Sequence, residues 1–287
     1  FRVSKCYRPS FFNLSFKNCI VSTRFLIGDD VLQSKGLLIK DCLFPKYTGL
    51  YLLNTDSALI INNHISAPII SGTYANPAPG INALRCNNIS ILKNYIEGQF
   101  STGISLSSSG TASKPCLIAN NSLSGSKETG SLISFSGSYI DILYNSCNLM
   151  YASSTGGTGV VIYGDFSNDV RLKNNILVNN GSGTAITMAD FSNFPETDYN
   201  IIYTKNNTDI QYKSKQYTLS NYQALSGKET HSTAANPQYI SNTDLHSKNT
   251  ALNGLATPIA NIQDDIQNKL RNAFMPNPGA FEFPANP

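Results

Sequence analysis

A basic pair, Arg171 and Lys173, comes closer than any other arrangement in this chain to a catalytic one. Their spacing of two residues places both side chains on one face of a β-strand, because successive side chains alternate between faces. Two such cations could neutralise the carboxylate of an acidic substrate while a base removes the neighbouring proton. Asp141 is the one carboxylate in a matching position. We expect no cofactor for a protein that only binds its ligand. If the protein removes a proton from an acidic substrate in this way, Ca²⁺ is the candidate cofactor.

Three aspartates, Asp165, Asp169 and Asp190, fall in successive predicted turns. They could supply the two carboxyl groups, about 5 to 9.5 Å apart, that glycoside hydrolysis requires. We favour a structural interpretation, because aspartate commonly hydrogen-bonds the backbone amides of turns. Surface or structural roles are also expected for the histidines, which are His64, His231 and His246. Because no compact catalytic cluster emerges, we favour binding over catalysis.

Tyrosine and asparagine side chains at outward strand positions offer a surface for a sugar chain. An aromatic ring can stack on a sugar, and an amide can hydrogen-bond its hydroxyl groups. The chain contains 15 Tyr and no Trp, so tyrosine has to supply the stacking. The candidate ligand-binding residues are Tyr51, Asn82, Tyr95 and Tyr163.

Strands have to position all of these residues, because short apolar segments recur around an Asn or Asp at steps of 22 to 31 residues. A drifting period of this kind predicts a solenoid in which each step is one coil with loops of variable length. A second apolar segment, often preceded by Gly, recurs between the anchors without helical periodicity. The anchors are Asn18, Asp41, Asn63, Asn94, Asn121, Asn145, Asn175 and Asn200.

The phase of the pattern places each anchor inside the solenoid. Apolar residues lie three positions before an anchor or two positions after it, as Ile118 and Leu123 do around Asn121. A buried amide is costly unless it is hydrogen-bonded, so we expect the anchors to stack as a ladder. The predicted fold is all-β, a parallel β-helix. Its coil should be right-handed, because crossover connections between parallel strands are almost always right-handed.

An apolar stripe occupies the position two residues before six anchors, which should face outward. Such a stripe is too long to leave in water. We expect a loop, a partner chain or a missing N-terminal segment to cover it; the alternative is a local bulge that makes these residues part of the core. They are Phe16, Ile39, Ile61, Leu92, Ala119 and Leu143.

Composition narrows the classes of partner. The net charge is +3 and 14% of residues are charged, without a basic cluster interleaved with aromatics, so we expect no nucleic-acid partner. No apolar run is long enough to cross a membrane.

Cys19 and Cys42 occupy equivalent positions in neighbouring coils, and the sequence is compatible with either a pair of free thiols or a disulfide. The chain begins without Met or an evident cap, so we expect that an N-terminal portion with its targeting signal is missing.

After Tyr203 the pattern changes, and an ordered set of motifs runs from the last coil into this region. This set resembles the C-terminal end of secreted bacterial right-handed parallel β-helix proteins of the pectate-lyase-like superfamily, especially those of Bacteroidetes. One departure is the missing Gly between Asp265 and Arg271. The matching motifs are Asp198-Tyr199-Asn200, His231-Ser232, Asn236-Pro237-Gln238-Tyr239, Asp244-Leu245-His246, Asp265, Arg271 and Gly279-Ala280-Phe281-Glu282.

The resemblance implies coils over residues 1–203 and a capping segment over 204–287 that packs on the same solenoid. Asp265, Arg271 and Glu282 are expected to pin this segment over the open end. The resemblance also implies a secreted or cell-surface protein that binds or scaffolds polysaccharide. One alternative is a polysaccharide lyase, with Arg171 and Lys173 as catalytic residues, or a glycoside hydrolase. The other is an adhesin or a structural subunit of a surface complex.

Overall fold

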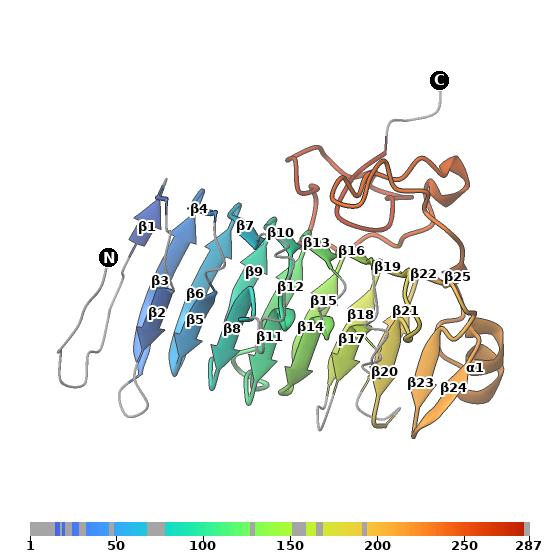
Figure 1. Ribbon diagram of the computed structural model, residues 1–287, viewed down its shortest axis with the longest axis horizontal. Coiled ribbons are helices and arrows are strands. Elements are labelled where there is room, and N and C mark those ends of the chain that lie inside the picture. Colours follow the sequence, from blue (N-terminus) through green and yellow to red (C-terminus); the bar gives the residue numbers. More distant parts are fainter. Residues whose placement is uncertain are drawn as a thin grey trace.

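The computed structural model describes residues 15–17, 19–20, 25–28, 33–45, 49–67, 78–126, 130–150, 159–164, 169–190 and 194–283. In this part of the chain each coil adds one strand to each of three parallel sheets, in the order A, B, C, and the coils stack side by side (Figure 1). This arrangement confirms the predicted all-β parallel solenoid.

The described strands of each sheet follow one another along the solenoid. Sheet A contains β1 (Ser15–Lys17), β3 (Ser34–Lys40), β6 (Thr55–Ile61), β9 (Ser90–Leu92), β12 (Cys116–Ala119), β15 (Ile140–Leu143), β18 (Val170–Lys173) and β21 (Glu196–Asp198). Sheet B contains β4 (Leu43–Phe44), β7 (His64–Ala67), β10 (Tyr95–Gly98), β13 (Ser122–Gly125), β16 (Ser146–Leu149), β19 (Ile176–Asn179), β22 (Ile201–Thr204) and β25 (Thr233–Ala234). Sheet C contains β2 (Phe25–Gly28), β5 (Leu50–Leu53), β8 (Ile81–Leu84), β11 (Thr102–Ser107), β14 (Ser131–Ser136), β17 (Val160–Gly164), β20 (Ile186–Met188), β23 (Ile210–Tyr212) and β24 (Lys215–Tyr217).

Aliphatic columns fill the interior between the sheets. In sheet A one column runs through register-paired, fully buried residues from coil to coil. Burial of each such side chain stabilises the fold by roughly 1.5–3 kcal/mol. The column consists of Ile39, Ile60, Ile91, Ile118, Ile142 and Leu172.

An asparagine ladder lines the corner between sheets A and B. Each Oδ1 accepts from the backbone N–H of the preceding member at 2.9–3.0 Å and from its Nδ2 at 3.0–3.1 Å. Every Nδ2 also donates to a backbone carbonyl of the coil before, as Asn121 does to Ile91 at 2.8 Å. The members are Asn63, Asn94, Asn121, Asn145, Asn175 and Asn200.

The expected rung at Asp41 was assigned one residue too early. Cys42, not Asp41, holds the ladder position, because the N–H of Cys42 donates to Oδ1 of Asn63 at 2.9 Å. Asp41 takes the preceding turn position, with φ 53°, as Asn62 does in the next coil with φ 56°. Asn and Asp tolerate this left-handed conformation, so the turn residue is of the same type as a ladder residue and was mistaken for one. Asn18 lies outside the described residues.

The same shift changes which side chains are inside the first coils. Ile20 and Leu43, expected to face inward, are 74% and 36% exposed, whereas Ile39 is in the core. Of the predicted apolar stripe, Ala119 and Leu143 do face outward and are buried by Ala256 and Ile262 of the C-terminal segment, with Leu92 and Ile259 packed beside them. A segment of this chain therefore covers this part of the stripe. The side chain of Phe16 lies outside the described part of the structure.

The C-terminal segment has two parts with different roles. The antiparallel pair β23–β24 and the helix α1 (Leu219–Ser226) close the end of the solenoid, where Leu219 and Tyr222 join the main core. Thr218 caps α1 at its N-terminus and Gly227, with φ 67°, ends it. We call residues 235–283 the tail; it includes the 3₁₀ turn η2 (Thr250–Leu252).

The tail runs back along the side of the solenoid, over sheet B and its corner with sheet A (Figure 1, red). Ser124 Oγ and Asn148 Nδ2 donate to the carbonyl of Asn242 at 2.6 and 3.0 Å, and the N–H of Ala280 donates to Ser146 Oγ at 2.9 Å. The expectation that Arg271 pins the tail over the open end is therefore wrong, because residues before 235 close that end.

Candidate functional site

Three of the four predicted ligand-binding residues lie in one row on the outer face of sheet C. Tyr51 pairs in register with Asn82, Asn82 with Ser105, Ser105 with Ser134, and Ser134 with Tyr163. Strand spacing makes this row about 19 Å long. All five side chains are uncharged and at least partly accessible, and Tyr163 is 39% exposed. We call these five residues the sheet C row.

A glycine makes room for one ring of the sheet C row. A Cβ atom at Gly49 would lie 2.7 Å from the ring of Tyr51, so glycine at this position leaves room for the ring. The row presents tyrosine at each end with serine and asparagine between, which provides stacking surfaces and neutral hydrogen-bonding groups. Sequence reasoning missed Ser105 and Ser134, although each stands at the same strand position as Asn82.

Tyr95 is separated from the sheet C row, because it belongs to β10 of sheet B. Its ring lies 6.4 Å from that of Phe281 in the tail and 6.2 Å from the imidazole of His64. Burial raises the pKa of Tyr95. Tyr95 therefore packs under the tail, and only the other three candidates share one surface.

The proposed catalytic pair lies together on β18, but each cation already has an anionic partner. Arg171 binds Asp141 of the preceding coil, with 2.6 Å between Nε and Oδ1, and this hydrogen bond raises the pKa of Arg171. Lys173 Nζ lies 3.5 Å from Glu196 of the next coil. To neutralise a substrate carboxylate, either cation would first have to leave its own partner.

A histidine not expected to act in chemistry packs on Tyr199, whose ring also lies near Lys173. His231 Nδ1 hydrogen-bonds Asp198 at 2.7 Å, and its ring stacks on Tyr199 with centroids 4.6 Å apart and planes 5° from parallel. Lys173 Nζ stands 5.9 Å from the centre of the same tyrosine ring. The bond to Asp198 holds the imidazole with Nε2 away from the carboxylate, which is the orientation that a general base needs.

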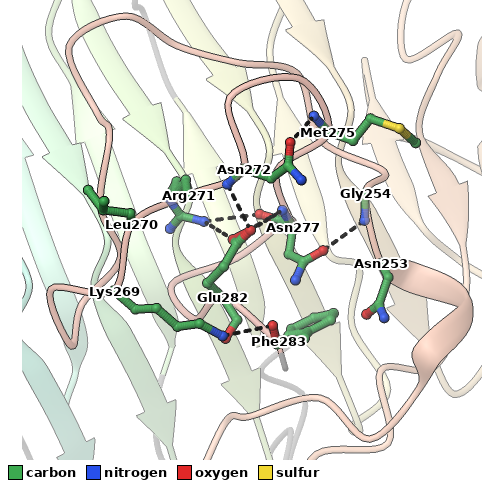
Figure 2. Close-up of a pocket in the computed structure, with 10 residues that line it drawn as sticks. All are labelled: Asn253, Gly254, Lys269, Leu270, Arg271, Asn272, Met275, Asn277, Glu282 and Phe283. Atoms are coloured by element: carbon green, nitrogen blue, oxygen red, sulfur yellow. Dashed lines mark hydrogen bonds and ion pairs between the residues drawn. The ribbon is translucent and has the colours of Figure 1, made fainter. Parts of the chain in front are cut away.

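A hollow of about 580 Å³ lies within the tail (Figure 2). Its polar groups serve the tail itself. Arg271 Nη1 lies 3.3 Å from Glu282 Oε2, and the backbone N–H groups of Asn272 and Asn277 donate to the same carboxylate (Figure 2). Burial lowers the pKa of Arg271 and raises that of Glu282. Desolvation thus outweighs the mutual attraction of this pair, as expected for a buried ion pair.

Arg271 also joins the tail to the solenoid. Its Nη2 donates to Asn120 Oδ1 at 2.7 Å and to the carbonyl of Gly279 at 2.9 Å, and its guanidinium carbon lies 3.9 Å from the ring centre of Tyr144. Asp265 supports the same fold of the tail by accepting from the N–H of Glu282 at 2.8 Å. These contacts make the hollow a structural feature of the tail.

The described part of the chain does not bring the other candidate residues together in one site. Asp165 lies outside the described residues, and Asp190 forms an exposed ion pair with Lys213 at 3.7 Å. His64 lies on the surface and contacts Glu97 at 2.8 Å, whereas His246 contacts Asp244 and the Phe281 ring. Among the described residues no group of three or more His, Cys, Asp or Glu is placed to hold a metal ion. No helix in this part of the chain is long and apolar enough to span a membrane.

Comparison with known families agrees with this architecture. A family described as a right-handed β-helix region matches residues 10–147 and 46–224, which together cover most of the chain. A comparison with curated proteins found no match.

Proposed function

The chain belongs to the right-handed β-helix family, and we propose that it binds a neutral polysaccharide along the sheet C row without cleaving it. The observation that carries this proposal is the continuous register of Tyr51, Asn82, Ser105, Ser134 and Tyr163 across five coils. A long, straight, repeating surface fits a repeating polymer, because each coil can contact the next unit of the ligand. We also propose that the protein acts outside the cell or on its surface, where such polymers occur.

The lack of charge in the sheet C row supports a neutral ligand. Arg171 and Lys173 lie on sheet A, not in this row, and both are paired with carboxylates. A uronate-rich polymer would therefore find no free cation among the row's side chains, whereas hydroxyl groups would find serine, asparagine and tyrosine partners.

The test is binding to immobilised neutral and acidic glycans by the wild-type protein and by tyrosine variants. Tyr163→Ala and Tyr51→Ala are expected to weaken binding of a neutral glycan by about two- to tenfold each, through loss of a stacking surface. Tyr139→Ala is the matched control, because Tyr139 is 37% exposed but lies outside the row. An equal loss of affinity in all three variants would contradict the proposal. Binding of the protein to acidic glycans alone would contradict it as well.

A lyase is the second candidate function, and the placement of both His231 and Lys173 against the ring of Tyr199 favours it. His231 could act as the base, with Lys173 released from Glu196 to neutralise a uronate. Unsaturated oligosaccharides released from an acidic glycan, and lost in Lys173→Ala and His231→Ala, would support the lyase over simple binding. Binding to a protein surface in place of any glycan would instead support an adhesin.

A further inference from the structure

The ladder position changes from amide to thiol in the first two described coils. Cys42 occupies the rung before Asn63, and the parallel bridge between Ile20 and Leu43 places Cys19 in the rung before Cys42. Both sulfur atoms make the same local contact, because each Sγ lies 3.2 Å from the carbonyl oxygen two residues earlier. The side-chain rung that links later coils is thus replaced here by two adjacent thiols.

The two thiols are close enough to react with each other. They stand in register on neighbouring parallel strands, whose spacing of about 4.8 Å falls within the Cα separations that disulfides span. The backbone N–H of Leu43 donates to the carbonyl of Cys19 at 2.7 Å, which fixes the two coils against each other at this point. The side chains of Cys19 and Cys42 also interact directly.

Accessibility distinguishes the two members of the pair. Cys19 is partly exposed, whereas Cys42 is 2% exposed. Burial is the main cause that raises the pKa of Cys42, and the charge of an ionised Cys19 raises it further. Cys19 is therefore the thiol that an outside reagent meets first, and Cys42 is placed to react second.

We propose that Cys19 and Cys42 are a site of oxidative modification, at which a small-molecule disulfide converts the thiol pair into a covalent rung between coils. The Cys19 thiolate attacks one sulfur of the reagent, forms a mixed disulfide and releases one thiol. The Cys42 thiolate then attacks Cys19 Sγ and releases the second thiol. In total, two cysteine thiols and one reagent disulfide give one protein disulfide and two reagent thiols.

The covalent rung closes one coil of the solenoid, since the two cysteines are 23 residues apart. It strengthens the interface between these coils, where the amide ladder supplies no side-chain link. Coils of a solenoid contact only their neighbours, so the effect is expected to be local.

The test treats the full chain with oxidised glutathione, followed by alkylation and peptide mass analysis without reduction. The expected product is a cross-linked peptide pair that contains Cys19 and Cys42 and has lost two hydrogen atoms. Hydrogen exchange at the Leu43 amide should slow by about tenfold or more on oxidation. Cys86→Ser is the control and should leave the cross-link intact, because Cys86 and Cys116 are buried elsewhere in the core.

Two single variants test whether the cross-link needs both cysteines, so that one of them still gives an answer if the other folds poorly. Cys19→Ser and Cys42→Ser should each abolish the cross-link, and neither should change exchange on oxidation. The proposal is overturned if both thiols of the folded wild-type protein remain open to alkylation after oxidation. It is equally overturned if glutathione stays on Cys19, or if the cross-link joins any other pair of cysteines.

Discussion

The side chain of Asn200 donates from Nδ2 to the carboxylate of Glu229, at 3.0 Å from Oε2, so the asparagine ladder ends on a buried acid. Glu229 is fully buried and also accepts hydrogen bonds from the hydroxyl groups of Thr197 and Ser232. Ser232 Oγ in turn accepts from the N–H of Asn200 at 2.8 Å. Two residues therefore replace the single amide that the next rung would have provided.

Replacement of this acid should change how stability depends on pH. Burial raises the pKa of Glu229 above its ordinary value, although three hydrogen-bond donors oppose the shift. The folded state then binds the proton more tightly than the unfolded state. This stabilisation is complete below the ordinary glutamate pKa and is lost as pH rises through the raised value. The glutamine of Glu229→Gln cannot titrate. As pH rises from the ordinary glutamate pKa through the raised pKa of Glu229, the free energy of unfolding of the wild type should therefore fall relative to that of this variant.

Urea unfolding of both proteins at several acidic and neutral pH values measures this difference. Glu196→Gln serves as the control, because Glu196 lies on the exposed face of sheet A. Parallel stability curves for the wild type and Glu229→Gln would rule out the predicted linkage.

Removal of a central rung should destabilise the solenoid. In Asn121→Leu, the N–H and Nδ2 of Asn94 lose their acceptor, and Oδ1 of Asn145 loses a donor. Each buried polar group left unsatisfied costs on the order of 1–3 kcal/mol. The thermal midpoint should therefore fall clearly, whereas Asn221→Leu on the exposed side of α1 should leave it nearly unchanged. A midpoint equal to that of the wild type would argue against the ladder's energetic role.

Arg271 should not tolerate lysine, although the charge is retained. Lysine cannot reproduce the fork that joins Asn120, Gly279 and Glu282, or the planar contact with Tyr144. Removing one partner of a buried charge pair costs about 3–5 kcal/mol, and Arg271→Lys, which keeps the charge but loses the forked hydrogen bonds, should cost less than that. In Arg271→Lys, amide protons of the tail should exchange faster while those of the ladder stay protected.

Arg171→Lys is the comparison for this prediction, because the side chain of Arg171 is 45% exposed and a surface pair contributes little. It should leave exchange in the tail unchanged. If Arg271→Lys instead unfolds the whole chain at once, the tail is not a separate layer but part of the same cooperative unit as the coils.

Periodicity could predict the coils but not the path of the tail. From Asn63 to Asn200 the anchors keep one phase, because each buried amide needs its neighbours. At Asp41 the signal failed, since Asp and Asn also suit the left-handed turn residue that precedes a rung. Alternation along strands correctly grouped Tyr51, Asn82 and Tyr163, whereas it could not separate Tyr95. The contacts of the tail, such as Arg271 with Asn120, join residues 151 positions apart and leave no repeat in the sequence.

At Gly98, strand β10 passes β7 too closely for any side chain. Gly98 has φ +118°, and a Cβ atom there would lie 1.7 Å from the carbonyl oxygen of Ala67. Gly98→Ala therefore combines an unfavourable backbone conformation with a backbone clash and should cost more than about 3 kcal/mol. Gly227→Ala isolates the first effect, because Gly227 has φ +67° with open space around it and should cost about 1–2 kcal/mol. Urea unfolding of the two variants measures both costs, and equal losses would mean that the strands separate at Gly98 without penalty.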